Sequence, residues 1–88
     1  MSLPGTNTAR TDLCEWLCVQ LAKELRLPPA TIDPDEPMVT YGLDSLTAAA
    51  ILAVVEQHVG FKVDPNALWD HPTAAAFAGF LAAGPAAD

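Results

Sequence analysis

The chain has 88 residues, of which 51% are hydrophobic and 17% are charged, and its formal net charge is −7. This length and composition predict one small folded domain with a single modest core, and they argue against a disordered chain. The acidic balance disfavours binding to nucleic acids and anionic membranes, and it favours basic protein partners. No apolar run could span a bilayer and the first residues lack the regions of a signal peptide, so we expect a cytoplasmic protein.

The first predicted element is a helix from about Asp12 to Arg26, with Thr11 or Asp12 as its N-cap. Cys14 and Cys18 lie four residues apart on the side of this helix that carries its leucines. A metal pair would need further ligands at suitable spacing, and the two histidines are distant in the sequence. We therefore expect both cysteines to be small core residues.

A long connection follows from Leu27 to Leu43. A loop of this length in so small a domain is uncommon, and it is usually functional or packed across the core. Its apolar residues are expected to anchor it, namely Ile32, Met38, Val39 and Tyr41. The ends of the chain, residues 1–8 and 84–88, are predicted to be tails or linkers, which leaves a domain of residues 9–83.

The second half of the chain predicts three more helices. The first runs from Ser45 to about Val59 and ends at Gly60, a candidate C-cap. A short helix begins at Asp64-Pro65 and reaches about Trp69, and Thr73 caps a last helix that ends before Gly84-Pro85. Structural roles are expected for the histidines and tryptophans, which are Trp16, His58, Trp69 and His71.

The stretch Gly42-Leu43-Asp44-Ser45-Leu46 places a serine in the first turn of a predicted helix. Asp44 is a candidate N-cap, because its carboxylate can accept a backbone N–H one turn on and complement the helix dipole. Ser45 then takes the first helical position, where unpaired backbone donors favour an anionic phosphodiester on its hydroxyl. Gly42 permits a positive φ and a sharp turn into the helix. From these residues alone, an ordinary cap without a function stays an open alternative.

The helix after Ser45 has two faces when its residues are projected at intervals of about 100°. Bulky residues gather with Ala48 on the predicted core face, and they are Ile51, Leu52, Val55 and Val59. The opposite side is a shallow, nearly uncharged stripe of Leu46, Ala49, Ala50, Ala53 and Gln57. Because small residues let another protein approach closely, we interpret this stripe as a docking surface. The alternative is that its alanines only supply helix propensity.

Two motifs together resemble a known family. They are Tyr41-Gly42-Leu43-Asp44-Ser45-Leu46 and, after the helix that ends at Gly60, Leu68-Trp69-Asp70-His71-Pro72-Thr73. In this order and spacing they are similar to the acyl carrier protein domain of polyketide synthases, over about Asp12 to Leu81. The resemblance implies an all-α four-helix bundle with a short third helix and a long loop between the first two. It also implies that Ser45 is the attachment point of 4′-phosphopantetheine.

The resemblance further implies the partners of the domain. A phosphopantetheinyl transferase would transfer the group from coenzyme A to Ser45, and Asp44 would help to orient that serine. An acyltransferase or an acyl-activating ligase would load the arm with an acyl group as a thioester, and a ketosynthase and other synthase enzymes would act on it. The domain would be a monomer with no catalytic residue and no bound metal ion.

The chain departs from the family at Ala50, where carrier proteins often have an acidic residue that docks on basic partner surfaces. Glu56 remains as an acidic residue on this helix and is a further candidate for docking. We expect recognition to depend on Leu46 and the alanine stripe more than on helix charge. Leu46→Ala should then weaken modification or acyl transfer much more than Glu56→Ala.

Three alternatives compete with this interpretation. A peptidyl carrier domain of a nonribosomal peptide synthetase would share the fold and the cofactor, but it usually has Gly-Gly-His-Ser or Gly-Gly-Asp-Ser before the leucine. A serine hydrolase is disfavoured because the chain has no Gly-x-Ser-x-Gly motif and is too short for that fold. The third alternative is a noncatalytic helical interaction module in which Ser45 is only a cap.

Overall fold

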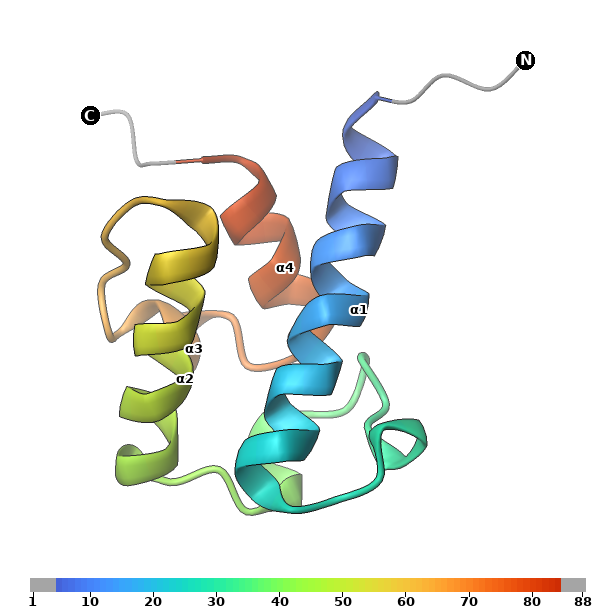
Figure 1. The fold of residues 1–88 in the computed structure, drawn as a ribbon, viewed down its shortest axis with the longest axis vertical. Helices are drawn as coiled ribbons and strands as arrows, with labels where there is room; N and C mark the ends of the chain where they lie inside the picture. The colour runs from blue at the N-terminus through green and yellow to red at the C-terminus, as the bar shows by residue number, and fades with distance from the viewer. Residues whose placement is uncertain (1–4, 85–88) are drawn as a thin grey trace.

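The computed structural model describes residues 5–84, in which helices are joined by loops (Figure 1). The elements are α1 (Gly5–Leu25), η1 (Pro29–Thr31), η2 (Met38–Tyr41), α2 (Ser45–Val59), α3 (Ala67–Asp70) and α4 (Ala74–Ala82), where η marks a 3-10 helix. Helix α1 runs downward in Figure 1, and α2 and α4 run upward beside it. The predicted all-α fold, with a short third helix and a long first connection, is confirmed.

The core lies where α1, α2 and α4 meet. Among the described residues no polar or charged side chain is buried. The largest fully buried side chains come from all four α-helices and from η2, and they are Leu17, Leu21, Met38, Ile51, Val55, Leu68 and Phe77. Helix α2 buries Ala48, Ile51, Leu52 and Val55, which confirms these residues of its predicted core face, and Val59 is only half-buried against the core cluster.

Helix α1 begins earlier than the sequence predicts. It starts at Gly5, so the start and cap predicted near Asp12 are wrong. The residues from Gly5 to Thr8 are poor helix formers without an apolar period, which is why the local sequence gives no signal for this extra length. Residues 5–8 of the predicted tail are therefore helical, while residues 1–4 and 85–88 lie outside the described residues.

The two cysteines are half-buried free thiols on α1. Cys18 packs against the core cluster, as predicted, although it is not fully buried. Cys14 is half-buried and does not belong to that cluster, so the prediction that it is a core residue is wrong. Burial raises the pKa of Cys14, and it raises the pKa of Cys18 to about 11. Within residues 5–84 no group of three His, Cys, Asp or Glu side chains could hold a metal ion.

The first connection is held by its own contacts. Ile32 and Met38 are buried, as predicted. The Tyr41 hydroxyl accepts a hydrogen bond from the backbone N–H of Asp33 at 2.8 Å. Val39 is 54% exposed, so the prediction that it anchors the loop is wrong. Because a 3-10 helix has three residues per turn, the residue after the buried Met38 points to a different side.

The first connection also pairs with the turn between α3 and α4. The backbone N–H of Met38 donates to the carbonyl of Pro72 at 2.8 Å, and the N–H of Ala75 donates to the carbonyl of Pro34 at 2.9 Å. An isolated antiparallel bridge lies between these two bonds. The connection is thereby fixed against the start of α4 before it enters α2.

The last two helices differ from the prediction at one boundary. The Thr73 hydroxyl accepts the N–H of Ala76 at 3.1 Å and caps α4, as predicted. Helix α3 begins at Ala67, later than the predicted start, because the Asp64 carboxylate accepts the N–H of Asn66 at 2.9 Å and forms a turn there. In the part of the chain that the structure describes, every helix is too short or too polar to cross a membrane.

Three of the four residues expected to be structural take part in ring stacking. The rings of Trp16 and His58 stack with centroids 3.9 Å apart and join α1 to α2. The ring of His71 stacks on Phe80 with centroids 4.7 Å apart, next to the start of α4. Trp69 is 44% exposed, so the prediction that it is a packing residue is wrong.

Candidate functional site

Ser45 is the first residue of α2, and its side chain is exposed. Asp44 has an extended backbone, with φ −124° and ψ −175°, and its Oδ1 accepts the backbone N–H of Thr47 at 2.9 Å. The N–H of Ala48 donates to the carbonyl of Asp44 at 2.8 Å. Asp44 is therefore the N-cap, as predicted, and Ser45 lies among backbone donors that have no partner inside the helix.

The chain enters α2 through a turn that requires glycine. Gly42 follows η2 with a φ of 98°, in the left-handed region that side chains with a Cβ disfavour. An added Cβ would meet nothing within 4 Å, so backbone conformation rather than crowding explains the glycine. Leu43 is buried and Leu46 is 82% exposed, so Asp44 and Ser45 lie between an anchored leucine and an exposed one.

Asp44 carries a negative charge next to the serine. The backbone N–H of Thr47, which donates to the carboxylate, holds the pKa of Asp44 below its ordinary value. The positive end of the helix dipole stabilises the same charge. Both histidines stack on aromatic rings, and no hydrogen bond within the described residues joins either one to Ser45. The site therefore presents an exposed hydroxyl without the arrangement of a hydrolase triad.

A groove of about 400 Å³ begins at Ser45 and follows α2. Its inner wall is the surface of α2, and its outer wall consists of the segment that leads into α3 together with Trp69 on α3. The lining residues are Ser45, Ala48, Ala49, Leu52, Glu56, Val63, Pro65 and Trp69. The groove cannot be predicted from the sequence, because only the fold brings the residues of the outer wall next to Ser45.

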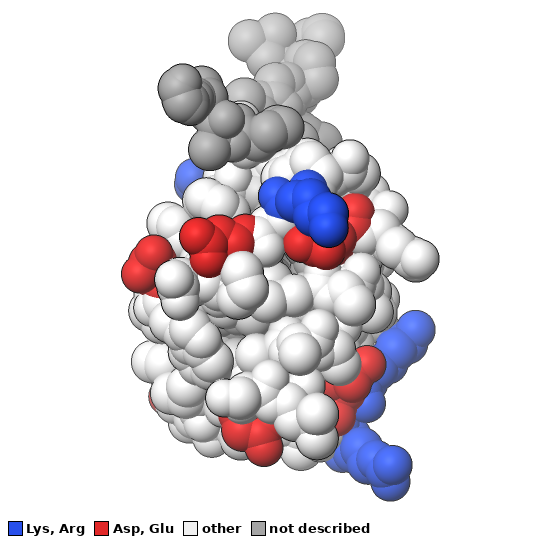
Figure 2. Space-filling model, turned by 90° about the vertical axis from the view of Figure 1, so that its left-hand side faces the viewer, with Lys and Arg blue, Asp and Glu red and all other residues white. Residues whose placement is uncertain are grey.

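The stripe predicted as a docking surface lies on the open side of α2. Leu46, Ala49, Ala53 and Gln57 are exposed, and Ala50 is half-buried. Figure 2 shows the side of the molecule that carries α2, where the surface is largely uncharged and the acidic groups are separate from one another. The fold therefore leaves this stripe accessible, and its role in docking stays a prediction.

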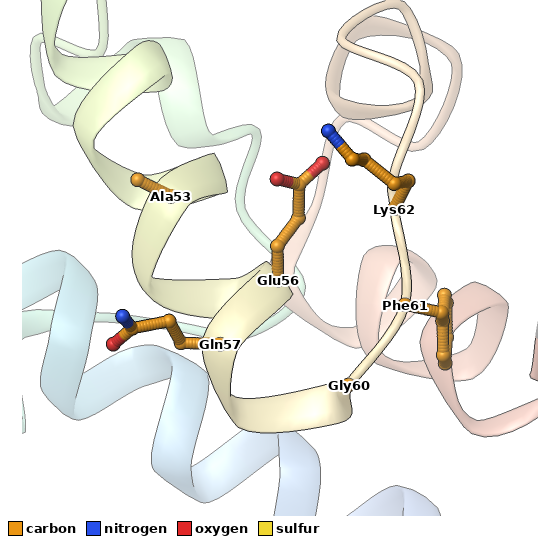
Figure 3. Close-up of a pocket in the computed structure, with 6 residues that line it drawn as sticks. All are labelled: Ala53, Glu56, Gln57, Gly60, Phe61 and Lys62. Atoms are coloured by element: carbon orange, nitrogen blue, oxygen red, sulfur yellow. The ribbon is translucent and has the colours of Figure 1, made fainter.

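Glu56 makes a contact that its position in the sequence does not reveal. Its Oε2 accepts the backbone N–H of Val63 at 2.8 Å, from α2 across to the following loop. Figure 3 shows the Lys62 side chain turned toward this carboxylate, beside a second groove of about 480 Å³ that Gly60 and Phe61 also line. A hydrogen bond between a helix and an irregular loop produces no periodic pattern, so this contact leaves no signal in the sequence.

Residues 15–81 match the protein family described as phosphopantetheine attachment site. The chain is similar to one of the subunits of phenolphthiocerol/phthiocerol polyketide synthase from Mycobacterium tuberculosis, with 37% identity over 81 residues. The matched part covers 92% of this chain and 4% of that protein, so the chain spans a small fraction of this relative's length.

Two solved structures have a similar fold. A free-standing peptidyl carrier protein from Acinetobacter baumannii has a TM-score of 0.81 and 35% identity, and the match covers 84% of this chain and 92% of that one. BlmI, a type-II acyl carrier protein from Streptomyces verticillus, has a TM-score of 0.84 and 24% identity, and the match covers 92% of this chain and 96% of that one. The second likeness supports the fold alone.

Proposed function

The chain belongs to the family of phosphopantetheine attachment domains, and we propose that Ser45 is the residue that bears its 4′-phosphopantetheine. The domain is a carrier domain of the polyketide synthase type. The observation that supports Ser45 most strongly is its exposed hydroxyl at the first position of α2, directly after the Asp44 cap. The residues present fit the group, because the helix N-terminus favours a phosphodiester and an open groove lies beside the serine.

The Ser45 hydroxyl is the nucleophile of the attachment. Its oxygen forms a bond to the phosphorus of coenzyme A that bears the pantetheine, and the pyrophosphate bond breaks. Adenosine 3′,5′-bisphosphate leaves, and the hydroxyl proton passes to the transferase. Asp44 keeps the start of α2 in place through Thr47 and so keeps the hydroxyl exposed. Once attached, the group supplies a flexible arm whose terminal thiol holds acyl groups as thioesters, and the domain itself catalyses no step.

The partners are a phosphopantetheinyl transferase, an acyltransferase or acyl-activating ligase, and a ketosynthase with other synthase enzymes. They dock beside Ser45, where the exposed Leu46 offers apolar area that a partner can bury. The stripe of Ala49, Ala50 and Ala53 allows a close approach along α2. The attachment of the group and the transfer of acyl groups take place in the cytoplasm, a compartment in which free cysteines stay reduced.

Intact-mass measurement tests the attachment. The chain has two serines, Ser2 and Ser45, so each can be replaced by alanine as the control for the other. After incubation with a broad-specificity transferase and coenzyme A, we expect one phosphopantetheinyl group on the wild type and on Ser2→Ala, and none on Ser45→Ala. A folded wild type that gains no mass would overturn the carrier function and leave the helical interaction module.

The cargo distinguishes the polyketide type from the peptidyl type. The similarity to a polyketide synthase supports an acyl cargo, although a peptidyl carrier protein is among the similar structures. Mass spectrometry of the thioester isolated from the native producer should show a carboxylic acyl group without an α-amino group. An aminoacyl thioester would assign the domain to the peptidyl type.

A further inference from the structure

Glu56 lies at the point where α2 and the following loop come together. Its side chain is half-buried, and it lines both the groove that begins at Ser45 and the groove shown in Figure 3. Its Oε2 accepts the backbone N–H of Val63 in a part-buried hydrogen bond of 2.8 Å. The Glu56 carboxylate is therefore engaged in a hydrogen bond within the fold.

Val63 leads directly into the outer wall of the groove at Ser45. The Val63 side chain is buried, and the next residue, Asp64, forms the turn that starts α3 through its bonds to Asn66 and Ala67, each 2.9 Å long. Helix α3 then presents the exposed ring of Trp69 to the groove. The position of the outer wall of the groove therefore depends on the position of the Val63 backbone, which the hydrogen bond to Glu56 holds.

We propose that Glu56 is a positioning residue that holds the outer wall of the groove at Ser45 through the Val63 N–H, and that partner access to Ser45 depends on this wall. The proposal rests on the proposed attachment at Ser45. In this role Glu56 acts through a carboxylate oxygen that accepts the Val63 N–H, whereas in a docking role it would act through its negative charge. The two roles make opposite predictions for two conservative substitutions.

Glutamine and aspartate separate the oxygen from the charge. Glu56→Gln removes the charge but keeps an oxygen at the same reach, so the bond to Val63 can form. Glu56→Asp keeps the charge but is one methylene shorter, so its oxygens fall short of the Val63 N–H. Glu56→Ala removes both, and Glu24→Gln on the exposed surface of α1 is the control for the loss of one negative charge.

The first measurement uses the unmodified protein and ¹H–¹⁵N NMR spectra. In Glu56→Ala and Glu56→Asp we expect faster hydrogen exchange at the Val63 amide and a shifted indole N–H resonance of Trp69. In Glu56→Gln and Glu24→Gln both signals should stay close to those of the wild type. An unchanged Val63 amide in Glu56→Ala would overturn the proposal.

The second measurement is the initial rate of phosphopantetheine transfer to Ser45, followed by intact mass. The loss of one hydrogen bond predicts a rate that is lower by about three- to tenfold in Glu56→Ala and Glu56→Asp, with Glu56→Gln near the wild type. A slow Glu56→Gln together with a normal Glu56→Asp would establish charge-based docking instead. A wild type that is not modified at all would refute the proposed function, while the Val63 and Trp69 signals would still decide whether Glu56 holds the wall.

Discussion

Truncation of Leu46 should slow the modification of Ser45 without destabilising the domain. Full burial of a leucine side chain contributes about 1.5–3 kcal/mol, and Leu46 has 82% of its surface available for a partner to bury. The available part corresponds to about 1.2–2.5 kcal/mol, or about an 8- to 70-fold lower kcat/KM for phosphopantetheine transfer to Leu46→Ala. Because the side chain makes few contacts inside the domain, its free energy of unfolding should change by less than about 0.5 kcal/mol.

The assay measures initial rates by intact mass, and urea denaturation of each variant measures stability. Val39→Ala is the matched control, because Val39 is also exposed and apolar but lies on η2. Leu68→Ala is the opposite control, since full burial of Leu68 predicts a loss of about 2–5 kcal/mol of stability. A rate for Leu46→Ala within twofold of the rate for Val39→Ala would refute the docking argument.

The structure also changes how the effects of Leu46→Ala and Glu56→Ala on the modification of Ser45 can be compared. From the sequence alone, Leu46→Ala tests docking through an apolar side chain and Glu56→Ala tests docking through a charge. Because Glu56 accepts the Val63 N–H, Glu56→Ala removes a hydrogen bond as well as a charge. Glu56→Gln is the cleaner contrast, and we expect it to be modified much faster than Leu46→Ala.

Two further predictions concern stability. Gly79→Ala should raise the free energy of unfolding, measured by urea denaturation, by about 0.5–1 kcal/mol, because alanine favours the helix. The flexible Arg10 side chain lies 3.3 Å from the new Cβ and can move away from it. A loss of stability would show that the contact with Arg10 outweighs the gain in helix propensity. Burial raises the pKa of Cys18 from 9.0 to about 11, so the folded state keeps a proton that the unfolded state releases, and stability should fall as the pH rises from about 9 to about 11. Urea denaturation at pH 8 and pH 10 should show a larger decrease for the wild type than for Cys18→Ala, and equal decreases would contradict the assignment.

The sequence predicted the parts of the structure that local chemistry controls. Asp44 caps α2 and Gly60 ends it with a φ of 84°, because each needs only the properties of one residue and its neighbouring backbone. Val39 is exposed, contrary to the prediction, because it follows the buried Met38 in a 3-10 helix and points to a different side, and apolar character alone does not show this direction. Trp69 was misplaced because its exposure depends on how α3 packs, which composition and spacing do not encode.

The two motifs that supported the family resemblance lie far apart in the sequence, and the fold supplies a physical reason for their joint occurrence. The second motif contains Pro72, whose carbonyl accepts the N–H of Met38 at the start of η2. The first motif begins at the end of η2, with Tyr41, and continues through Gly42 into the start of α2. The second motif thus fixes the connection that delivers Ser45 to its exposed position. A change in the backbone at Pro72 would therefore act on the serine through η2, although Pro72 is not a residue that lines the groove at Ser45.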